Sequence, residues 1–300
     1  MSIDPVVKDL GKGVYAYVQP NGSWGVNNAG ILTGPDGAIL VDTCFTVART
    51  KRLLAAVAKV SSREVRTVFN THHHGDHTWG NFMVPGATII GHRNCRTEMM
   101  KRGFGPKDAF PGVDWGEVEL VPPSVLFDDR VDFFAGDLAV EAYALGPAHS
   151  TSDVVVYIPE LRVLFTGDLV FNGGTPFVVG GSVAGSLTAY DRLRQFDCAV
   201  VVPGHGPICG PAVFDEMEAY LRFVESTARD AYTAGLTPLD AARQTDLGRF
   251  GEWRETERLA ANLHRAYAEL RGEQLGGDLD ARTAWRDMAT FSGQPLRSAA

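Results

Sequence analysis

Histidine is concentrated in one short stretch of this sequence. Four of the 8 histidines in 300 residues lie at positions 72–77, within FNTHHHGDHTWGN. In an extended chain, side chains two positions apart point the same way, so His72 and His74 are expected to converge on one point. His73 is then expected to face away and to be exposed. Two converging neutral imidazoles are typical ligands for a metal ion.

The same stretch continues with a second set of metal-binding groups. Gly75 allows the chain to turn, so that Asp76 and His77 can face a second point nearby. A carboxylate and an imidazole at that point would suit a second cation beside the first. The alternative is a solvated polar loop, and the choice depends on whether further donors occur elsewhere in the chain.

Three such donors stand at or near predicted strand ends. His149 lies in the Gly-Pro turn of LGPAHSTSD, Asp168 ends an apolar run in VLFTGDLVF, and His205 stands between two glycines in AVVVPGHGP. A carboxylate is costly to bury unless something cationic meets it. These positions therefore favour a metal site, at an edge where strands open, over a solvated loop.

The pattern of apolar residues predicts the elements that position these donors. Short apolar runs bounded by turn residues predict strands, and apolar residues at helical spacing predict helices. Both halves combine strands with helices, which predicts an α/β fold with the layers αββα. A long loop rich in glycine, proline and aromatic residues is expected at 103–123. The predicted strands are 13–19, 29–33, 37–43, 65–71, 86–90, 125–134, 138–145, 153–158, 162–166 and 198–203, and the predicted helices are 48–60, 92–102, 187–196, 212–233 and 254–271.

Composition and charge limit the classes of partner. The formal net charge is −8, and we find no cluster of Lys and Arg, so we expect no nucleic-acid partner. No apolar run is long enough to span a bilayer, and the first residues show no basic-then-apolar signal, which predicts a cytoplasmic protein without a membrane partner. The four cysteines suggest free thiols. The apolar side of the helix at 212–226 could form a dimer interface, so a homodimer is one expected assembly.

The motifs THHHGDH, GPAHS, FTGD and PGHGP follow the order found in the metallo-β-lactamase superfamily, which the sequence resembles over roughly residues 13–210. The resemblance implies a four-layer αββα sandwich with metals at one edge. Residues 1–210 would form the metal-binding domain, and 211–300 a helical C-terminal region packed on the same domain. The resemblance also assigns the seven donors to two metal ions: His72, His74 and His149 to the first, Asp76, His77 and His205 to the second, and Asp168 as the bridge between them.

The activity implied by this resemblance is dinuclear zinc-dependent hydrolysis. A metal-bound hydroxide would attack the carbonyl of a thioester, ester or lactone, and Asp76 would also orient the nucleophile and so act in catalysis. The same seven donors occur in glyoxalase-type hydrolases, lactonases and single-iron persulfide dioxygenases, which leaves iron or manganese open beside two Zn²⁺. A non-enzymatic metal-binding relative is an alternative from a different class.

Aromatic residues near the motifs favour a bulky apolar or aromatic acyl substrate. The predicted substrate-binding residues are Trp24, Asn28, Trp115 and Phe177, although each aromatic residue could equally be core packing. Asp42, which ends a predicted strand, is expected either to hold a ligand histidine or to bind backbone amides.

The stretches SWGVNNAG and TERLAANLHRAYAEL resemble the metal-dependent cyclase-thioesterases of bacterial aromatic polyketide pathways. That likeness implies an alternative activity, ring closure in antibiotic biosynthesis, and a small-molecule acyl substrate that a carrier protein could present. Two histidines outside the motifs receive structural interpretations, His92 as a helix cap and His264 as a helix-surface residue.

Overall fold

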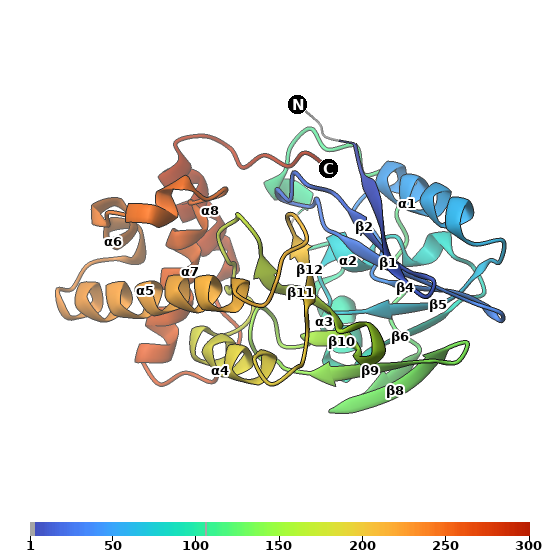
Figure 1. Cartoon of the computed structure of the whole chain (residues 1–300). Helices are drawn as coiled ribbons and strands as arrows, with labels where there is room; N and C mark the ends of the chain where they lie inside the picture. Colours follow the sequence, from blue (N-terminus) through green and yellow to red (C-terminus); the bar gives the residue numbers. More distant parts are fainter. Residues whose placement is uncertain (1–3, 106) are drawn as a thin grey trace.

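Two β-sheets form the centre of the molecule (Figure 1). The computed structural model describes residues 4–105 and 107–300. The larger sheet has seven strands in sequence order, antiparallel from β1 to β4 and parallel from β4 to β7. Its strands are β1 (Val6–Gly11), β2 (Val14–Val18), β3 (Ala29–Gly34), β4 (Gly37–Val41), β5 (Val65–Asn70), β6 (Thr88–His92) and β7 (Val125–Phe127).

The smaller sheet has five strands in the order β12-β11-β10-β9-β8 and is antiparallel except between β11 and β12. Its inner face packs on the larger sheet, because Val140 and Val156 share one buried cluster with Val14 and Phe69. Its strands are β8 (Arg130–Ala135), β9 (Leu138–Ala144), β10 (Val154–Ile158), β11 (Val163–Phe171) and β12 (Val200–His205).

Helices cover the outer faces of both sheets, which confirms the predicted four-layer αββα fold. Leu53 of α1 packs with Leu40 of the larger sheet, and Leu187 of α4 belongs to the cluster that covers Leu164 of the smaller sheet. The helices are α1 (Val47–Val60), α2 (Gly75–Thr78), α3 (Arg93–Arg102), α4 (Val183–Leu193), α5 (Val213–Thr233), α6 (Pro238–Gln244), α7 (Arg258–Leu270) and α8 (Ala281–Ser292).

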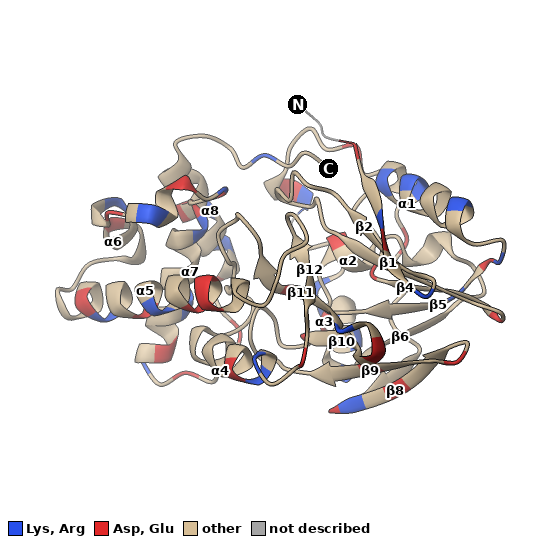
Figure 2. Cartoon of the chain, viewed as in Figure 1, with Lys and Arg blue, Asp and Glu red and all other residues tan. Residues whose placement is uncertain are grey.

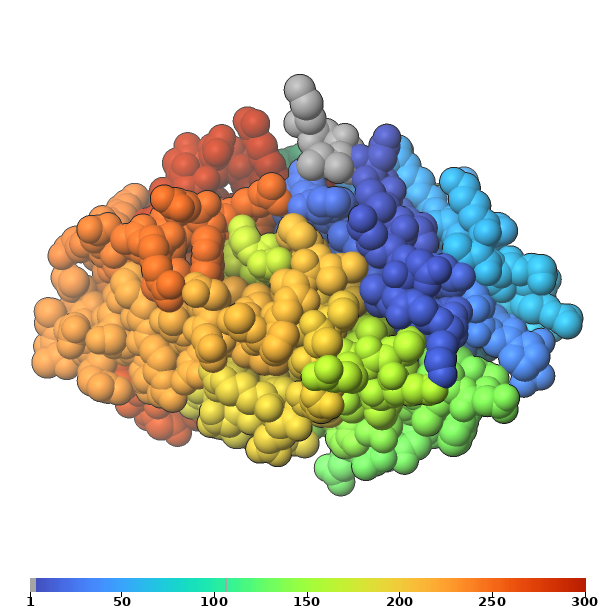
Figure 3. Space-filling model, viewed as in Figure 1, coloured from blue at the N-terminus to red at the C-terminus, as the bar shows by residue number. Residues whose placement is uncertain are grey.

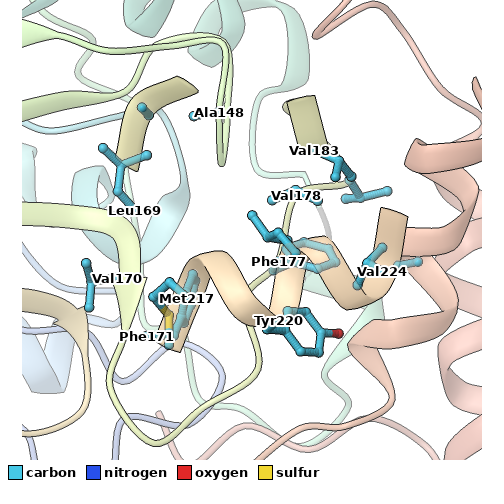
Figure 4. Close-up of a cluster of buried hydrophobic side chains, with 14 of the residues drawn as sticks. Ala148, Leu169, Val170, Phe171, Phe177, Val178, Val183, Met217, Tyr220 and Val224 are labelled. Atoms are coloured by element: carbon cyan, nitrogen blue, oxygen red, sulfur yellow. The ribbon is translucent and has the colours of Figure 1, made fainter. Parts of the chain in front are cut away.

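The helices α5 to α8 pack on one another beside the two sheets, as the orange and red part of Figure 3 shows. They share one hydrophobic cluster with the smaller sheet, in which Phe171 of β11 lies close to Met217 of α5 (Figure 4). The exposed side of α5 carries both signs of charge (Figure 2), for example Arg222 paired with Glu218. The proposed domain boundary between residues 210 and 211 stays a prediction.

The structure corrects several predicted element limits. The segment 125–134 is not one strand but two, β7 and β8, which lie in different sheets because the chain turns at Asp128 and Asp129 after the buried Phe127. The edge strand β1 was not predicted, since most of its residues are only partly buried or exposed. Within the described ranges, no helix has the length and apolar character needed to cross a bilayer.

Candidate metal centre

The seven predicted donors come together where strands of both sheets end. His72 and His74 follow β5, Asp76 and His77 lie in α2, and His149 follows β9. Asp168 lies inside β11 and His205 is the last residue of β12, so both belong to the strands rather than following them. Their side-chain atoms form two groups, within each of which the atoms lie within 4.8 Å of one another: His72, His74, His149 and Asp168 in one, and Asp76, His77 and His205 in the other. We call these seven residues the donor cluster.

Asp168 reaches both groups. Its Oδ2 lies 3.4 Å from Nε2 of His149 in the first group and 3.4 Å from Nε2 of His205 in the second. Its Oδ1 lies 3.0 Å from Nε2 of His77. A carboxylate in this position has one oxygen available to each of two neighbouring cations.

The histidines are oriented by contacts on the side away from the cluster. Nδ1 of His77 lies 2.7 Å from Oδ2 of Asp42, and Nδ1 of His205 lies 3.2 Å from the carbonyl oxygen of Gly22. Nδ1 of His149 contacts the carbonyl oxygen of Phe177. A carbonyl or carboxylate at Nδ1 fixes the tautomer and leaves the Nε2 lone pair free for a metal ion.

His74 presents its other nitrogen. Its Nδ1 lies 2.8 Å from Nε2 of His149, so Nδ1 faces the cluster, while Nε2 faces Gly180, where an added Cβ would lie 3.8 Å away. This arrangement follows from the backbone, since His74 is the N-cap residue of α2 and lies in extended conformation.

Asp42 supports two parts of the site at once. Its Oδ1 accepts a hydrogen bond of 2.8 Å from the backbone N–H of Thr71, and its Oδ2 accepts one of 2.7 Å from the Thr71 hydroxyl, in addition to the contact with His77. Asp42 has a φ of 67°, an uncommon conformation for a non-glycine residue. Both predicted roles are therefore present, because the carboxylate binds a backbone amide and also holds a candidate ligand.

Protonation differs between the two groups. Burial, together with neighbouring histidines, lowers the pKa of His74 to about 3, and burial lowers the pKa of His149 to about 4, so both imidazoles are neutral donors. Burial acts in the same direction on His205, but Asp168 and Asp76 outweigh it and raise the pKa of that imidazole to about 9. The carboxylates thus favour positive charge beside the second group.

The donor cluster fits divalent cations. Nε2 of His72, Nε2 of His77 and Oδ1 of Asp168 are buried, and none of them makes a hydrogen bond of good geometry among the described residues, although the last two atoms lie 3.0 Å apart. Buried polar atoms without partners are costly unless something coordinates them. Imidazole nitrogens with carboxylate oxygens are a ligand set that suits zinc, and also iron and manganese.

His73 differs from its prediction. It is buried rather than exposed, with 5% of its surface accessible, and its Nδ1 lies 3.1 Å from Oγ of Ser152. The loop after β9 covers it, which strand alternation alone could not predict.

The two histidines outside the motifs lie away from the donor cluster. His92 caps α3 as expected, because its side chain accepts a hydrogen bond from the N–H of Asn94. Nε2 of His264 lies 2.8 Å from Oδ2 of Asp287.

A cavity of about 620 Å³ opens beside the donor cluster. His74, Asp76, His149, Asp168 and His205 all contribute to its lining. One side of the cavity is aromatic, and we call it the aromatic wall: Trp24, Phe45, Phe110, Phe177 and Trp285. Trp24 is its centre, with ring centroids 5.6 Å from Phe110, 5.0 Å from Phe177 and 5.4 Å from Trp285.

Two of the four predicted substrate-binding residues line this cavity and two do not. Trp24 and Phe177 do. Trp115 lies behind Phe45, with ring centroids 4.6 Å apart, and is not among the lining residues. Asn28 is buried and donates to the carbonyl oxygens of Pro203 and Gly206, so it braces the strand that ends at His205.

The C-terminal helices supply lining residues that the sequence did not predict. Arg258 and Arg265 of α7 and Trp285 of α8 are among them. The same region holds Trp24 in place: Glu257 accepts a hydrogen bond of 2.9 Å from the indole N–H, and the guanidinium of Arg258 lies 3.9 Å from the ring centroid. The only available sequence signal was the amphipathic pattern of α7, which predicted packing but not a cavity.

Comparison with known proteins agrees with this geometry. The family model of the metallo-beta-lactamase superfamily matches residues 22–205, a range that includes all seven donors. The residues of α7 and α8 that line the cavity lie outside the matched range.

Curated relatives are distant. A metallo-beta-lactamase type 2 of Bacteroides fragilis is 25% identical over 240 residues, covering 76% of this chain and 90% of that protein. A linear primary-alkylsulfatase of a Pseudomonas species is 22% identical over 268 residues, and an atrochrysone carboxyl ACP thioesterase of Emericella nidulans is 28% identical over 202 residues. These matches cover 72% and 67% of this chain, and 49% and 58% of the relatives, so the chain spans about half the length of those two proteins.

Solved structures show the same fold. The metallo-beta-lactamase from Pontibacter korlensis superposes with a TM-score of 0.61 at 22% identity, covering 73% of this chain and 99% of the other. The family match over most of the sandwich, the fold and the arrangement of the donors agree, and we conclude that the chain belongs to the metallo-beta-lactamase superfamily.

Proposed function

We propose that this protein is a dinuclear zinc-dependent hydrolase that cleaves the thioester, ester or lactone bond of a bulky, aromatic acyl substrate. Superfamily members are metal-dependent hydrolases, which sets the general reaction. The observation that carries the narrower proposal is the position of the aromatic wall, which lines the same cavity as the donor cluster. A flat acyl group packed on the wall would bring its carbonyl beside the donors.

The seven donors would divide between two zinc ions. His72, His74 and His149 would hold one ion, Asp76, His77 and His205 the other, and Asp168 both. Bound there, the ions would lower the pKa of a water molecule and polarise the substrate carbonyl.

Asp76 contributes a further role from the protein side. Burial acts to raise its pKa, but His77 and His205 outweigh that effect and lower it, so the carboxylate is ionised and can only accept hydrogen bonds. Its side chain is 14% exposed and lines the cavity. Asp76 would therefore accept a hydrogen bond from the attacking water and orient that water toward the carbonyl.

The test combines metal content with a substrate panel. Purified protein should carry about two divalent ions per chain, by analogy with two-metal hydrolases, and zinc-loaded protein should hydrolyse aromatic acyl thioesters faster than acetyl thioesters or β-lactams. Comparing the activity of the protein reloaded with iron or manganese with that of the zinc-loaded protein decides which metal supports the reaction. A folded protein that binds metal but hydrolyses no member of the panel would support a non-enzymatic relative instead.

A second candidate is ring closure on an aromatic polyketide chain. The observation that favours it is the relative named as an atrochrysone carboxyl ACP thioesterase, whose substrate is attached to a carrier protein. In that reaction ring closure would precede release of the chain. Incubation with a carrier-bound poly-β-keto chain, followed by mass spectrometry, separates a cyclised product from a linear acid.

The oligomeric state is a separate question. A homodimer stays a prediction that light scattering can test.

A further inference from the structure

The cavity is lined by a buried arginine whose hydrogen-bond partners are uncharged carbonyl oxygens. Arg265 lies on α7, lines the cavity and is only 2% exposed. Its Nε and Nη2 donate to the carbonyl oxygen of Val179 at 3.1 and 2.7 Å, and Nη2 also donates to the carbonyl oxygen of Gly277 at 2.8 Å. Nη1 has no hydrogen-bond partner in the described part of the chain.

No carboxylate within ion-pairing distance neutralises Arg265 among residues 4–105 and 107–300. Burial lowers the pKa of its guanidinium, while the more distant carboxylates of Glu269, Glu273 and Asp278 oppose that effect. A buried cation of this kind is costly unless an anion joins it.

Three other arginines line the same cavity, and one of them, Arg258, already forms an ion pair. Arg102, at the end of α3, pairs with Glu98 at 2.5 Å on one side. Arg282, at the start of α8, is exposed and forms no ion pair within the described ranges. The three arginines other than Arg258 come from three different helices, so their convergence is a property of the tertiary fold.

Arg265 lies beside the donor cluster along the lining of the cavity. Val179, whose carbonyl oxygen accepts from Arg265, is followed by Gly180, which faces Nε2 of His74. The aromatic wall also lines the cavity. A substrate that fills the cavity would therefore meet the wall, the donors and Arg265.

We propose that Arg265, together with Arg102 and Arg282, binds an anionic oxygen group of the substrate, a carboxylate, sulfate or phosphate, while the aromatic part of the same molecule packs on the aromatic wall. This inference rests on the proposed function and narrows its substrate class to acyl compounds that carry a second, negatively charged group. Guanidinium groups suit such anions because their planar N–H donors match the oxygen geometry.

The test measures binding rather than turnover. Chelator-treated protein is titrated with 2-naphthoate and with neutral 2-naphthamide, and binding is followed by calorimetry and by quenching of tryptophan fluorescence. Wild type is expected to prefer the anion by roughly 10- to 100-fold, the range for a hydrogen bond between charged groups. Naphthyl phosphate and naphthalene sulfonate, tested in the same way, decide which anion fits.

Variants assign the preference to the arginines. R265Q removes the charge and is expected to abolish the preference for naphthoate without changing the affinity for naphthamide, whereas R265K, which keeps the charge, should retain part of it. Arg282→Gln should weaken naphthoate binding to a smaller degree. The matched control is Arg286→Gln, one turn further along α8 and outside the cavity lining.

Several outcomes would overturn the inference. Equal binding of naphthoate and naphthamide would do so, and so would a preference that survives R265Q, because it would assign the anion to protonated histidines of the donor cluster. If R265Q does not fold, the pair R102Q and R282Q decides the question. A preference that depends on Arg265 in a protein that hydrolyses nothing would contradict the proposed function but keep the anion site.

Discussion

The donor cluster and the aromatic wall face the same cavity but are built in different ways. The donors lie in strands, or in the turns and the short helix that follow strands, between residues 72 and 205. Hydrogen bonds such as that between Asp42 and His77 set the direction of the imidazoles. The wall combines Trp24 with Phe110 from the long loop and Trp285 from α8. Ring packing holds these side chains together, and the hydrogen bond from the Trp24 indole to Glu257 adds to it. Removing a donor should therefore abolish chemistry, whereas removing a wall residue should change which substrate is accepted.

The largest expected effect comes from Asp168, whose carboxylate oxygens reach both groups of donors. Asp168→Asn keeps the shape but removes the negative charge between the two proposed cation positions. We therefore expect metal content to fall and turnover to drop by more than about 100-fold, beyond the roughly 10- to 100-fold range for residues that only support ligands. Metal analysis and circular dichroism check this, with the exposed Asp191→Asn as the control. Full metal content and wild-type turnover would disprove the bridging role.

Asp42 tests whether orientation matters within the donor cluster. Asp42→Asn keeps an acceptor for the N–H of Thr71 but loses the charged contact with Nδ1 of His77. We expect zinc affinity to fall roughly 10- to 100-fold, measured by competition with a chelator. Asp36→Asn, in the exposed turn between β3 and β4, should leave affinity unchanged. An equal loss in both variants would remove Asp42 from the site.

Trp285 tests the wall alone. Its ring centroid lies 5.4 Å from Trp24 and 5.7 Å from Phe177, so Trp285→Ala should open the wall without touching a donor. We expect KM for an aromatic acyl thioester to rise roughly 5- to 10-fold, from lost aromatic contacts, with kcat and metal content unchanged. The same rise for an acetyl thioester would show a general disturbance. Trp253→Ala, which removes packing on Tyr220 and Phe250, is the control.

Trp115 should give the smallest effect on substrate choice. The sequence favours it as a substrate-binding residue, but it packs behind Phe45 and 5.4 Å from Trp79. Trp115→Ala should therefore lower the thermal midpoint, by about 2–4 °C for each kcal/mol lost, while the ratio of KM values for aromatic and acetyl thioesters stays within about twofold, as for residues away from a site. A large change in that ratio would move Trp115 into the wall.

The sequence predicted the donor cluster better than the wall for a physical reason. Four of the donors are neighbours in the chain, so their spacing alone indicates a common metal site: His72, His74, Asp76 and His77. Asp42 could be predicted because it ends a strand beside them. The layers of the fold followed from apolar periodicity, although the split between β7 and β8 did not, because a short turn within a predicted strand leaves little trace in the apolar pattern.

The wall could not be predicted in this way because its members are distant in sequence. Nothing local connects Phe110 with Trp285, whose rings lie 5.8 Å apart in the structure. Arginine is also rarely buried, so Arg258 and Arg265 on an amphipathic helix suggest an exposed face. Both are among the largest fully or nearly fully buried side chains, at 1% and 2% exposure. Only the packed structure shows that they face a cavity.

The bonds around Trp24 also have a consequence for the order of folding. This residue contacts Glu255, Glu257 and Ser298, which are 231, 233 and 274 positions away along the chain. Contacts that close such long loops lose the most chain entropy before they gain anything, and they form late. The sheets with their donors can assemble from shorter-range pairings. During refolding the protein should therefore become able to bind metal before it becomes able to choose a substrate.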